Sequence, residues 1–251
     1  MIKTMIYGAN GKMGQLIGKK CEYHDQVEIV AGVDKTPDKY ANYFPVFTNP
    51  FSFKGEVDLI IDFSHPTYLD TLLEYASINK IPVVLATTGY SEDQIKRINE
   101  VSKFIPILKS ANMSIGVNVI KQILKQYTKV MAELYDIEII EKHHNKKLDA
   151  PSGTAYLLAN TINNALDHKK EFVYGRHGDK LRSKEQIGIH AVRGGTIAGE
   201  HTVLFAGDDE VIEIKHQALS REIFASGAIK AGIMLYKWSP GLYQMDDLFQ
   251  F

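Results

Sequence analysis

The sequence predicts an α/β protein in which a parallel-sheet domain is followed by an α+β domain with a mixed sheet. Three observations predict it. The first third of the chain alternates short β-rich runs with stretches of helical periodicity, and such alternation is typical of parallel βαβ units. The second part contains strand-like runs separated by glycine-rich turns, which favours antiparallel or mixed pairing. The length of 251 residues suits one large domain or two small ones.

The first part contains five expected strands and three expected helices. Leu69, Leu72, Leu73 and Ala76 lie at helical spacing and give the second helix an apolar face. The expected strands are 3–7, 28–34, 58–63, 82–86 and 105–109, and the expected helices are 11–23, 67–79 and 91–103.

The pattern changes after about residue 112. The expected elements there are helices 117–134, 154–166 and 223–236 and strands 136–141, 188–193, 201–206 and 211–217. We expect the last helix to return to the first domain. The predicted domains are therefore residues 1–112 with 221–251, and residues 113–220.

Composition and charge exclude several classes of protein. The formal net charge is −1, which argues against a general nucleic-acid binder. The longest uncharged run, residues 150–166, contains Pro, Gly, Ser, Thr and Asn and is too polar to span a membrane. The N-terminus lacks the pattern of a signal peptide. A single cysteine, Cys21, excludes an intramolecular disulfide framework and a cysteine-based zinc site. We therefore expect a cytoplasmic protein without nucleic-acid or membrane partners.

A glycine-rich loop, residues 8–14, follows the first expected strand and opens the first expected helix. Small residues there let the backbone turn tightly and approach a pyrophosphate, while the helix N-terminus offers unpaired N–H groups to it. Asp34 ends the second strand, 20 residues after Gly14, where a carboxylate accepts hydrogen bonds from ribose hydroxyls. The context predicts a Rossmann-type nucleotide-binding domain. The alternative is a tight turn that binds no ligand.

The choice between the two nicotinamide cofactors depends on charge. Asp34 alone favours NADH, because a carboxylate repels the 2′-phosphate of NADPH. Lys35 and Lys12 could neutralise that phosphate, although Lys35 could equally be a solvated surface lysine. The sequence therefore permits NADPH or NADH and slightly favours NADPH.

Three further turns are expected at the carboxyl ends of parallel strands, where open α/β sheets bind ligands. Their small and hydroxyl-bearing residues suit a nicotinamide carboxamide, and without the glycine loop they would be ordinary turns. They comprise residues 63–66, 86–89 and 110–113.

A second candidate site lies in residues 141–155. His143, His144 and Lys147 offer a group that transfers protons near neutral pH and cations for an anionic substrate. Residues 151–154, Pro-Ser-Gly-Thr, predict a helix start whose N–H groups cradle a carboxylate or phosphate.

Two other interpretations of this segment compete with a substrate site. One is a lysine-rich surface loop with solvated histidines. The other is a metal site, but His143 and His144 are adjacent and point apart in an extended segment, and the chain has no cysteine partner for them. We therefore predict no metal.

Together these blocks resemble the 4-hydroxy-tetrahydrodipicolinate (dihydrodipicolinate) reductase family of the diaminopimelate route to lysine. The most specific block is 141–155, which is similar to the family signature E-x-H-H-x-x-K-x-D-A-P-S-G-T-A. The other blocks follow in the family's order at 8–14, 62–66, 86–89, 111–118 and 193–195.

The resemblance implies NAD(P)H-dependent reduction of a small cyclic dicarboxylate, with His143 as proton donor and Lys147 as second donor. It implies that His144, Gly153 and Thr154 hold the substrate's carboxylates, and that the sheet of the second domain builds a homotetramer. It also implies a set of cofactor contacts, namely Gly8, Ala9, Asn10, Gly11, Lys12, Met13, Asp34, Lys35, Ala86, Thr87, Thr88, Ser110, Ala111, Asn112 and Met113.

The chain departs from the family pattern at two positions. Met113 stands where many members carry an aromatic residue, and His65 stands where some carry arginine.

Two rival functions share the glycine loop. Another two-domain NAD(P)-dependent oxidoreductase, such as an amino-dicarboxylate dehydrogenase, would not need the block 143–154. A non-enzymatic nucleotide sensor would not need His143 and Lys147.

Overall fold

The computed structural model describes residues 1–249. The chain divides into two compact units, Met1–Ile115 with Glu222–Phe251, and Gly116–Arg221. The first boundary lies three residues beyond the expected one at 112, and the second lies one residue beyond the expected one at 220. No helix among the described residues has both the length and the apolar character that crossing a membrane requires.

The first unit contains a seven-stranded sheet in which every pair of neighbouring strands is parallel. Its order, β3-β2-β1-β4-β5-β6-β12 from one edge, reverses direction between β1 and β4. The carboxyl ends of these two strands form the switch point at which such sheets bind ligands. The strands are β1 (Ile2–Tyr7), β2 (Val27–Val33), β3 (Val46–Phe47), β4 (Leu59–Asp62), β5 (Val83–Leu85), β6 (Pro106–Lys109) and β12 (Gly241–Tyr243).

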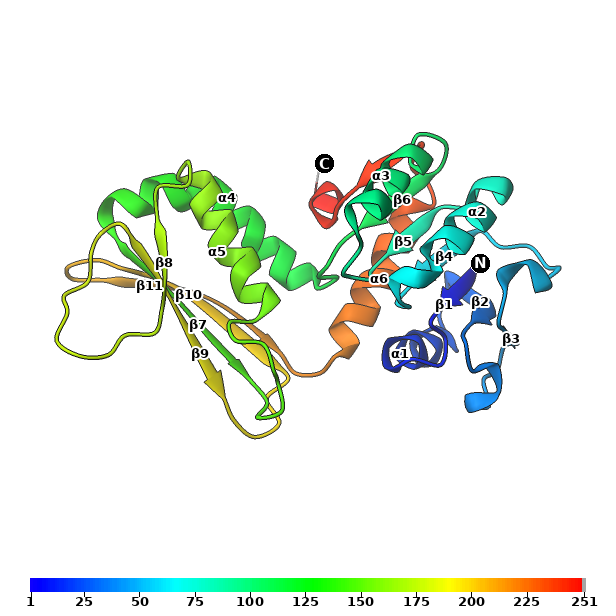
Figure 1. Cartoon of the computed structure of the whole chain (residues 1–251), viewed down its shortest axis with the longest axis horizontal. Helices are drawn as coiled ribbons and strands as arrows, with labels where there is room; N and C mark the ends of the chain where they lie inside the picture. Colours follow the sequence, from blue (N-terminus) through cyan, green and yellow to red (C-terminus); the bar gives the residue numbers. More distant parts are fainter. Residues whose placement is uncertain (250–251) are drawn as a thin grey trace. The chain divides into compact units, whose positions relative to one another are not determined.

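Helices cover both faces of this sheet (Figure 1). α1 (Lys12–Cys21) and α6 (Glu222–Leu235) pack in one core cluster, and α2 (Leu69–Asn79) and α3 (Glu92–Val101) pack in the other. The predicted apolar face of α2 is buried, which confirms that helix. The short 3-10 helices are η1 (Pro37–Lys39), η2 (Pro50–Ser52), η3 (Pro66–Tyr68) and η4 (Met245–Phe249).

Helix α6 returns to the first unit, as the sequence predicts, and it packs very closely on the sheet. A Cβ at Gly232 would lie 2.5 Å from Leu59 Cδ2, and one at Gly227 would lie 1.8 Å from the carbonyl oxygen of Met113. Glycine at these two positions therefore allows the helix to approach its neighbours.

The second unit contains a five-stranded mixed sheet of order β11-β10-β7-β9-β8. β10 pairs antiparallel with β7 and β11, whereas β9 pairs parallel with β7 and β8. The predicted mixed sheet is thereby confirmed. The helices and strands of this part of the chain are α4 (Ile115–Leu134), β7 (Asp136–His143), α5 (Gly153–Ala165), β8 (Glu171–Tyr174), β9 (Gln186–Arg193), β10 (Gly199–Ala206) and β11 (Val211–Ala218).

One face of this sheet is covered and the other is not. Burial alternates along β7, and its residues Ile137 and Ile139 join Leu124 of α4 and Leu158 of α5 in one core cluster. Successive side chains of a strand point to opposite faces, so Glu138, Ile140 and Lys142 lie on the face away from this cluster.

Candidate active site

The glycine loop of the first unit is compact enough to require glycine at both ends. Gly8 has φ +77°, and a Cβ there would lie 2.7 Å from the carbonyl oxygen of Phe63. A Cβ at Gly14 would lie 2.2 Å from the carbonyl oxygen of Gly8 and 2.6 Å from that of Ala9. Gly11, the N-cap of α1, makes no side-chain capping bond. This helix start is thus shaped for close approach of an anionic group.

The carboxylate of Asp34 ties the end of β2 to the glycine loop. Its Oδ2 accepts a hydrogen bond from the backbone N–H of Asn10 at 2.9 Å. Its Oδ1 accepts from the backbone N–H and the hydroxyl of Thr36 at 3.0 and 2.9 Å. The residue therefore has a structural role besides the ribose contact predicted for it.

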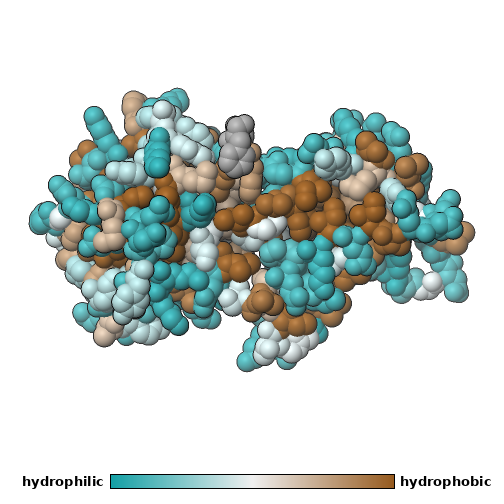
Figure 2. Space-filling model, turned by 180° about the vertical axis from the view of Figure 1, so that it is seen from behind, coloured by the Kyte–Doolittle hydropathy of each residue, from teal (hydrophilic) through white to brown (hydrophobic). Residues whose placement is uncertain are grey.

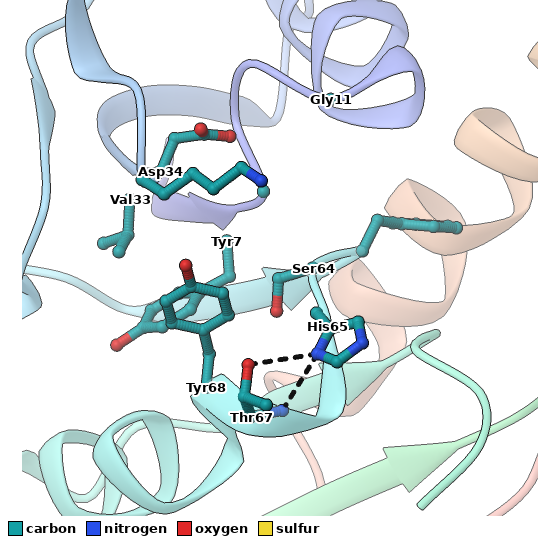
Figure 3. A pocket seen from close by; sticks show the side chains of 11 residues that line it. Tyr7, Gly11, Val33, Asp34, Ser64, His65, Thr67 and Tyr68 are labelled. Carbon is teal, nitrogen blue, oxygen red and sulfur yellow. Dashed lines mark hydrogen bonds between the residues drawn. The ribbon is translucent and has the colours of Figure 1, made fainter.

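A cavity of about 390 Å³ opens at the carboxyl ends of β1, β2 and β4. Figure 3 shows Asp34 on one wall and Ser64, His65 and Thr67 on the opposite wall. His65 Nδ1 accepts from the backbone N–H of Thr67 at 3.3 Å and caps η3. The lining residues are Tyr7, Gly8, Gly11, Val33, Asp34, Lys35, Phe63, Ser64, His65, Thr67 and Tyr68.

Four of the predicted cofactor residues, Gly8, Gly11, Asp34 and Lys35, line this cavity. Within the loop, Ala9 and Asn10 are buried, whereas Lys12 is exposed. Sequence reasoning missed Thr67 and Tyr68. These two residues lie directly after the turn that follows β4, at the switch point of the sheet. This position was the sequence signal that could have identified them as lining residues.

A buried aspartate connects the turns after β4 and β5. The Asp62 carboxylate is 2% exposed and accepts from the backbone N–H of Ser64 at 2.9 Å and from the Tyr90 hydroxyl at 3.1 Å. Burial raises the pKa of Asp62, and the hydrogen bonds from Ser64 and Tyr90 act in the opposite direction. The predicted segment 86–88 is joined to this aspartate through the backbone N–H of Ala86, which donates to the Asp62 carbonyl at 2.9 Å, although the segment does not line the cavity.

The predicted segment 110–113 follows β6. The Ser110 hydroxyl donates to the carbonyl of Asn112 at 2.9 Å, which closes the turn, and Ala111 is exposed. Met113 is 2% exposed and belongs to the core cluster that includes α1 and α6. Its side chain is therefore a core residue, which argues against a side-chain contact with nicotinamide.

In the second unit, β7 continues two residues beyond its predicted end at 141. His143 is consequently the last strand residue, paired with Arg193 of β9, and its carbonyl accepts from the backbone N–H of Gly194 at 2.9 Å. His143 is buried and His144, just beyond the strand, is half-buried. The candidate proton donor is thus part of the sheet, whereas we expected it two residues beyond the end of the strand.

Glu141 and Arg193 form the centre of this site, and sequence reasoning assigned neither a role. Glu141 is 0% exposed. Its Oε2 lies 2.6 Å from His143 Nδ1 and accepts from Arg193 at 2.8 Å, and its Oε1 accepts from Arg193 at 2.7 Å and from the Ser152 N–H at 3.0 Å. Burial raises the pKa of Glu141, but these hydrogen bonds outweigh it and lower the pKa overall.

Two neighbouring histidines lie in this site. Burial lowers the pKa of His143, while Glu141 raises it and Lys147 and Arg193 lower it. His201 Nε2 lies 2.9 Å from the Ser152 hydroxyl, and the rings of His143 and His201 meet edge to face at 5.1 Å. Burial and the charge of His143 lower the pKa of His201 to about 4. His201 is therefore neutral at neutral pH.

The start of α5 lies next to this cluster. Ser152 is its N-cap and accepts from the backbone N–H of Ala155 at 3.2 Å, which confirms the predicted helix start. Gly153 and Thr154 are the first two helical residues. Gly153 is exposed, and a Cβ on it would meet nothing within 4 Å. The first turn of α5 is open to an anionic group at this position.

Hydrogen bonds within the loop between β7 and α5 hold Lys147. Its ammonium donates to the Asp149 carboxylate at 2.8 Å, and its backbone N–H donates to the carbonyl of His144 at 3.1 Å. Arg193 donates to the Asp149 carbonyl at 2.6 Å. Lys147 is half-buried whereas Lys146 is exposed. The structure therefore distinguishes two adjacent lysines.

No group of three or more His, Cys, Asp or Glu side chains among residues 1–249 is arranged to hold a metal ion. The predicted residues of the second unit, His143, His144, Lys147, Gly153 and Thr154, form one continuous segment. His143 is bonded to the Glu141 carboxylate, which also accepts from the backbone N–H of Ser152, the N-cap of α5.

Comparison with known proteins gives a consistent result over the whole chain. Residues 2–113 match the family model described as dihydrodipicolinate reductase, N-terminus, and residues 116–249 match the model described as dihydrodipicolinate reductase, C-terminus. The 4-hydroxy-tetrahydrodipicolinate reductase of Clostridium novyi is 51% identical over 99% of this chain and 98% of its own. That of Clostridium tetani is 52% identical over 98% and 96%.

A solved structure is similar over the same extent. The dipicolinate-bound dihydrodipicolinate reductase from Paenisporosarcina sp. TG-14 superposes with a TM-score of 0.83 at 26% identity, covering 99% of this chain and 100% of its own.

Proposed function

The chain belongs to the dihydrodipicolinate reductase family, and on this premise we propose the roles of its residues. It is an NAD(P)H-dependent oxidoreductase that reduces 4-hydroxy-tetrahydrodipicolinate to tetrahydrodipicolinate in the diaminopimelate route of lysine biosynthesis. The observation that carries the assignment of roles is the buried His143, bonded to a carboxylate beside the open start of α5.

The substrate's carboxylates bind at the start of α5. Gly153 and Thr154 are the first two residues of this helix, where the helix dipole favours negative charge. Lys147 and His144 add donors, and Lys147 exchanges its Asp149 partner for a substrate carboxylate. In support, the relative from Paenisporosarcina is bound to dipicolinate, a cyclic dicarboxylate.

His143 supplies the proton that the reduced ring needs. A bound nicotinamide would supply the hydride, and a proton donated by a positioned group neutralises the negative charge that develops on the substrate ring. Burial lowers the pKa of free His143, but two substrate carboxylates nearby raise it again, because negative charge favours the imidazolium. His201, with a pKa of about 4, does not compete for the proton.

The first unit binds the cofactor. The glycines at 8 and 14 leave no room for side chains, the start of α1 lacks a side-chain cap, and the adjoining cavity has space for an adenosine. These features fit a dinucleotide whose pyrophosphate lies at residues 8–13. Segments 86–88 and 110–112, at the carboxyl ends of the next two strands, would then lie along the nicotinamide half.

Lys35 provides the preference for NADPH. It lines the cavity beside Asp34, so its ammonium can neutralise a 2′-phosphate. Lys35→Ala should therefore weaken NADPH binding by roughly tenfold, or about 1–2 kcal/mol, and leave NADH nearly unchanged. Fluorescence titration with each cofactor measures the difference. Equal losses for both cofactors would remove Lys35 from this role.

Lys147 and Lys146 should behave differently, because only Lys147 is half-buried in the site. Lys147→Ala should raise KM and lower kcat, since a charge-assisted contact with a substrate carboxylate is lost. Lys146→Ala should change neither constant. Steady-state kinetics of the two variants provide the comparison, and similar kinetics for both would favour a generic basic surface loop.

We also propose that the chain assembles as a homotetramer through the uncovered face of the second unit's sheet. Figure 2 shows hydrophobic side chains gathered in a band across this unit, and Val192, on the uncovered face, is 44% exposed. Sedimentation equilibrium measures the mass of the assembly.

The cytoplasmic location stays a prediction from the sequence.

The proposed function is tested by following NADPH oxidation with freshly generated 4-hydroxy-tetrahydrodipicolinate. Turnover that depends on this substrate, and competitive inhibition by dipicolinate, are the expected results. Turnover with an amino dicarboxylate instead would favour the rival dehydrogenase. Binding of NADPH without any turnover would favour a nucleotide sensor.

A further inference from the structure

We propose that Glu141 is a positioning residue that sets the protonation of His143 and joins it to the carboxylate-binding start of α5. The proposal rests on the function of His143 as proton donor. Glu141 is two residues before His143 on β7, so both side chains point to the same face of the sheet. The sheet itself therefore holds the pair together.

The Glu141 carboxylate has no capacity left for a substrate. Two ionised oxygens offer about four acceptor positions, and four contacts use them: one from His143, two from Arg193 and one from the Ser152 N–H. The side chain is 0% exposed. Glu141 thus acts through its neighbours and does not touch the reacting atoms.

An ionised Glu141 determines which nitrogen of His143 carries the proton in the neutral ring. Nδ1 lies 2.6 Å from the carboxylate, and because a carboxylate only accepts, Nδ1 must be the donor. Nε2 makes no hydrogen bond to the described residues and lies near Gly199, where a Cβ would come within 3.1 Å of it. Nε2 is consequently the atom that gains and releases the catalytic proton.

The other charged groups around His143 mostly oppose its protonation. Arg193 on β9 and Lys147 in the following loop both lower its pKa. His201 on β10 is neutral at neutral pH, and His216 on β11 is its partner across the strand pair. The Asp149 carboxylate is paired with Lys147. Glu141 is thus the one carboxylate in direct contact with His143 among residues 1–249, and its charge keeps the imidazolium accessible.

The same carboxylate also fixes the start of α5. Its Oε1 accepts from the N–H of Ser152, the N-cap, whose hydroxyl contacts both Ala155 and His201. The distance between the proton donor and the first turn of α5 therefore depends on one buried side chain. Residues held this way keep a site at the geometry that catalysis requires.

The test is Glu141→Gln, which keeps the size and removes the charge. We expect the midpoint for titration of His143, followed by NMR of the imidazole nitrogens, to fall by about one to three pH units. Each unit lost makes the imidazolium about tenfold rarer above the midpoint, so kcat near neutral pH should fall by roughly 10- to 100-fold. The descending limb of the pH profile of kcat/KM should move to lower pH by the same amount, since the active form is the protonated one.

Glu138→Gln is the matched control. Glu138 is on the same strand but on the opposite face, and it has the same kinds of partner: Arg176 at 2.7 Å, Arg182 at 3.0 Å and His190 Nε2 at 2.7 Å. Its loss removes an equivalent charged network from the sheet. It should leave the titration of His143 unchanged, whatever it does to stability or assembly.

The outcomes separate this inference from the proposed function. If Glu141→Gln leaves the His143 titration and the pH profile unchanged while His143→Gln is inactive, the positioning role is wrong and the acid role stands. If His143→Gln keeps its kcat, the acid role itself fails. Nitrogen chemical shifts of the unmodified protein show which ring nitrogen of neutral His143 carries the proton, and this measurement works even if Glu141→Gln does not fold. A neutral His143 that carries its proton on Nε2 would overturn the inference.

Discussion

His143→Gln should lose roughly 10²- to 10⁴-fold in kcat, the usual contribution of a positioned general acid, while KM for the substrate changes little. Glutamine cannot release a proton near neutral pH, and its side chain is short enough for the buried position at the end of β7. The groups that we propose for carboxylate binding, at Gly153 and Thr154, stay in place. Substrate binding and proton transfer should therefore separate cleanly in steady-state kinetics.

His177→Gln is the control for this experiment, because His177 is exposed and lies outside the site. It should keep the parent kcat. NADPH affinity should be the same in both variants, since the glycine loop belongs to the first unit. A His143→Gln protein with near-normal kcat would leave the substrate unchanged but pass the acid role to Lys147 or to water.

The pH dependence of the parent protein follows from the same group. The acid must be protonated, so kcat/KM should be level at low pH and fall as pH rises through the pKa of His143. Burial lowers that pKa below its ordinary value, so the fall should begin on the acid side of the value for an exposed histidine. In the His143→Gln protein this limb should disappear.

Gly14→Val should destabilise the first unit and abolish cofactor binding. Even the Cβ of the new residue would lie 2.2 Å from the Gly8 carbonyl oxygen and 2.7 Å from Ala9 Cα. These are backbone atoms of the loop, so the loop has to move. Overpacking of a core costs about 1–3 kcal/mol, and a clash with backbone should place the loss at or above the upper end of that range.

Gly194→Val is the control for this second variant, because a Cβ at Gly194 would meet nothing within 4 Å. Its stability should change by less than about 1 kcal/mol. Urea unfolding gives the free energies, and fluorescence titration gives the NADPH affinities. A stable Gly14→Val protein that binds NADPH normally would contradict the assignment of residues 8–14 as the pyrophosphate loop.

Short-range signals explain what the sequence predicted correctly about the fold. The apolar face of α2 and the helix start at Ser152 depend on residues within one or two turns of each other. The strand β7 was expected to end at 141, yet it continues to His143. Pairing with β9 and β10 extends it, and partners so far away in the sequence leave no local pattern.

Three short strands were missed for the same reason. β3 has two residues, β12 has three and β8 has four, and none of them has the run of buried residues that marks the equally short β4, β5 and β6. Each exists because a longer strand offers its free edge: β2 for β3, β6 for β12 and β9 for β8. Backbone pairing, rather than side-chain preference, determines them.

The sequence by itself was enough to predict the chemistry at the centre of each candidate site, because the loop at 8–14 and the segment at 143–154 are each contiguous and contain their own glycine, cation and helix start. Only the tertiary structure decided how that chemistry is controlled. Glu141 and Arg193 are 52 positions apart and meet because β7 and β9 are neighbours in one sheet. A buried carboxylate needs such partners to stay ionised, and folding alone brings them together.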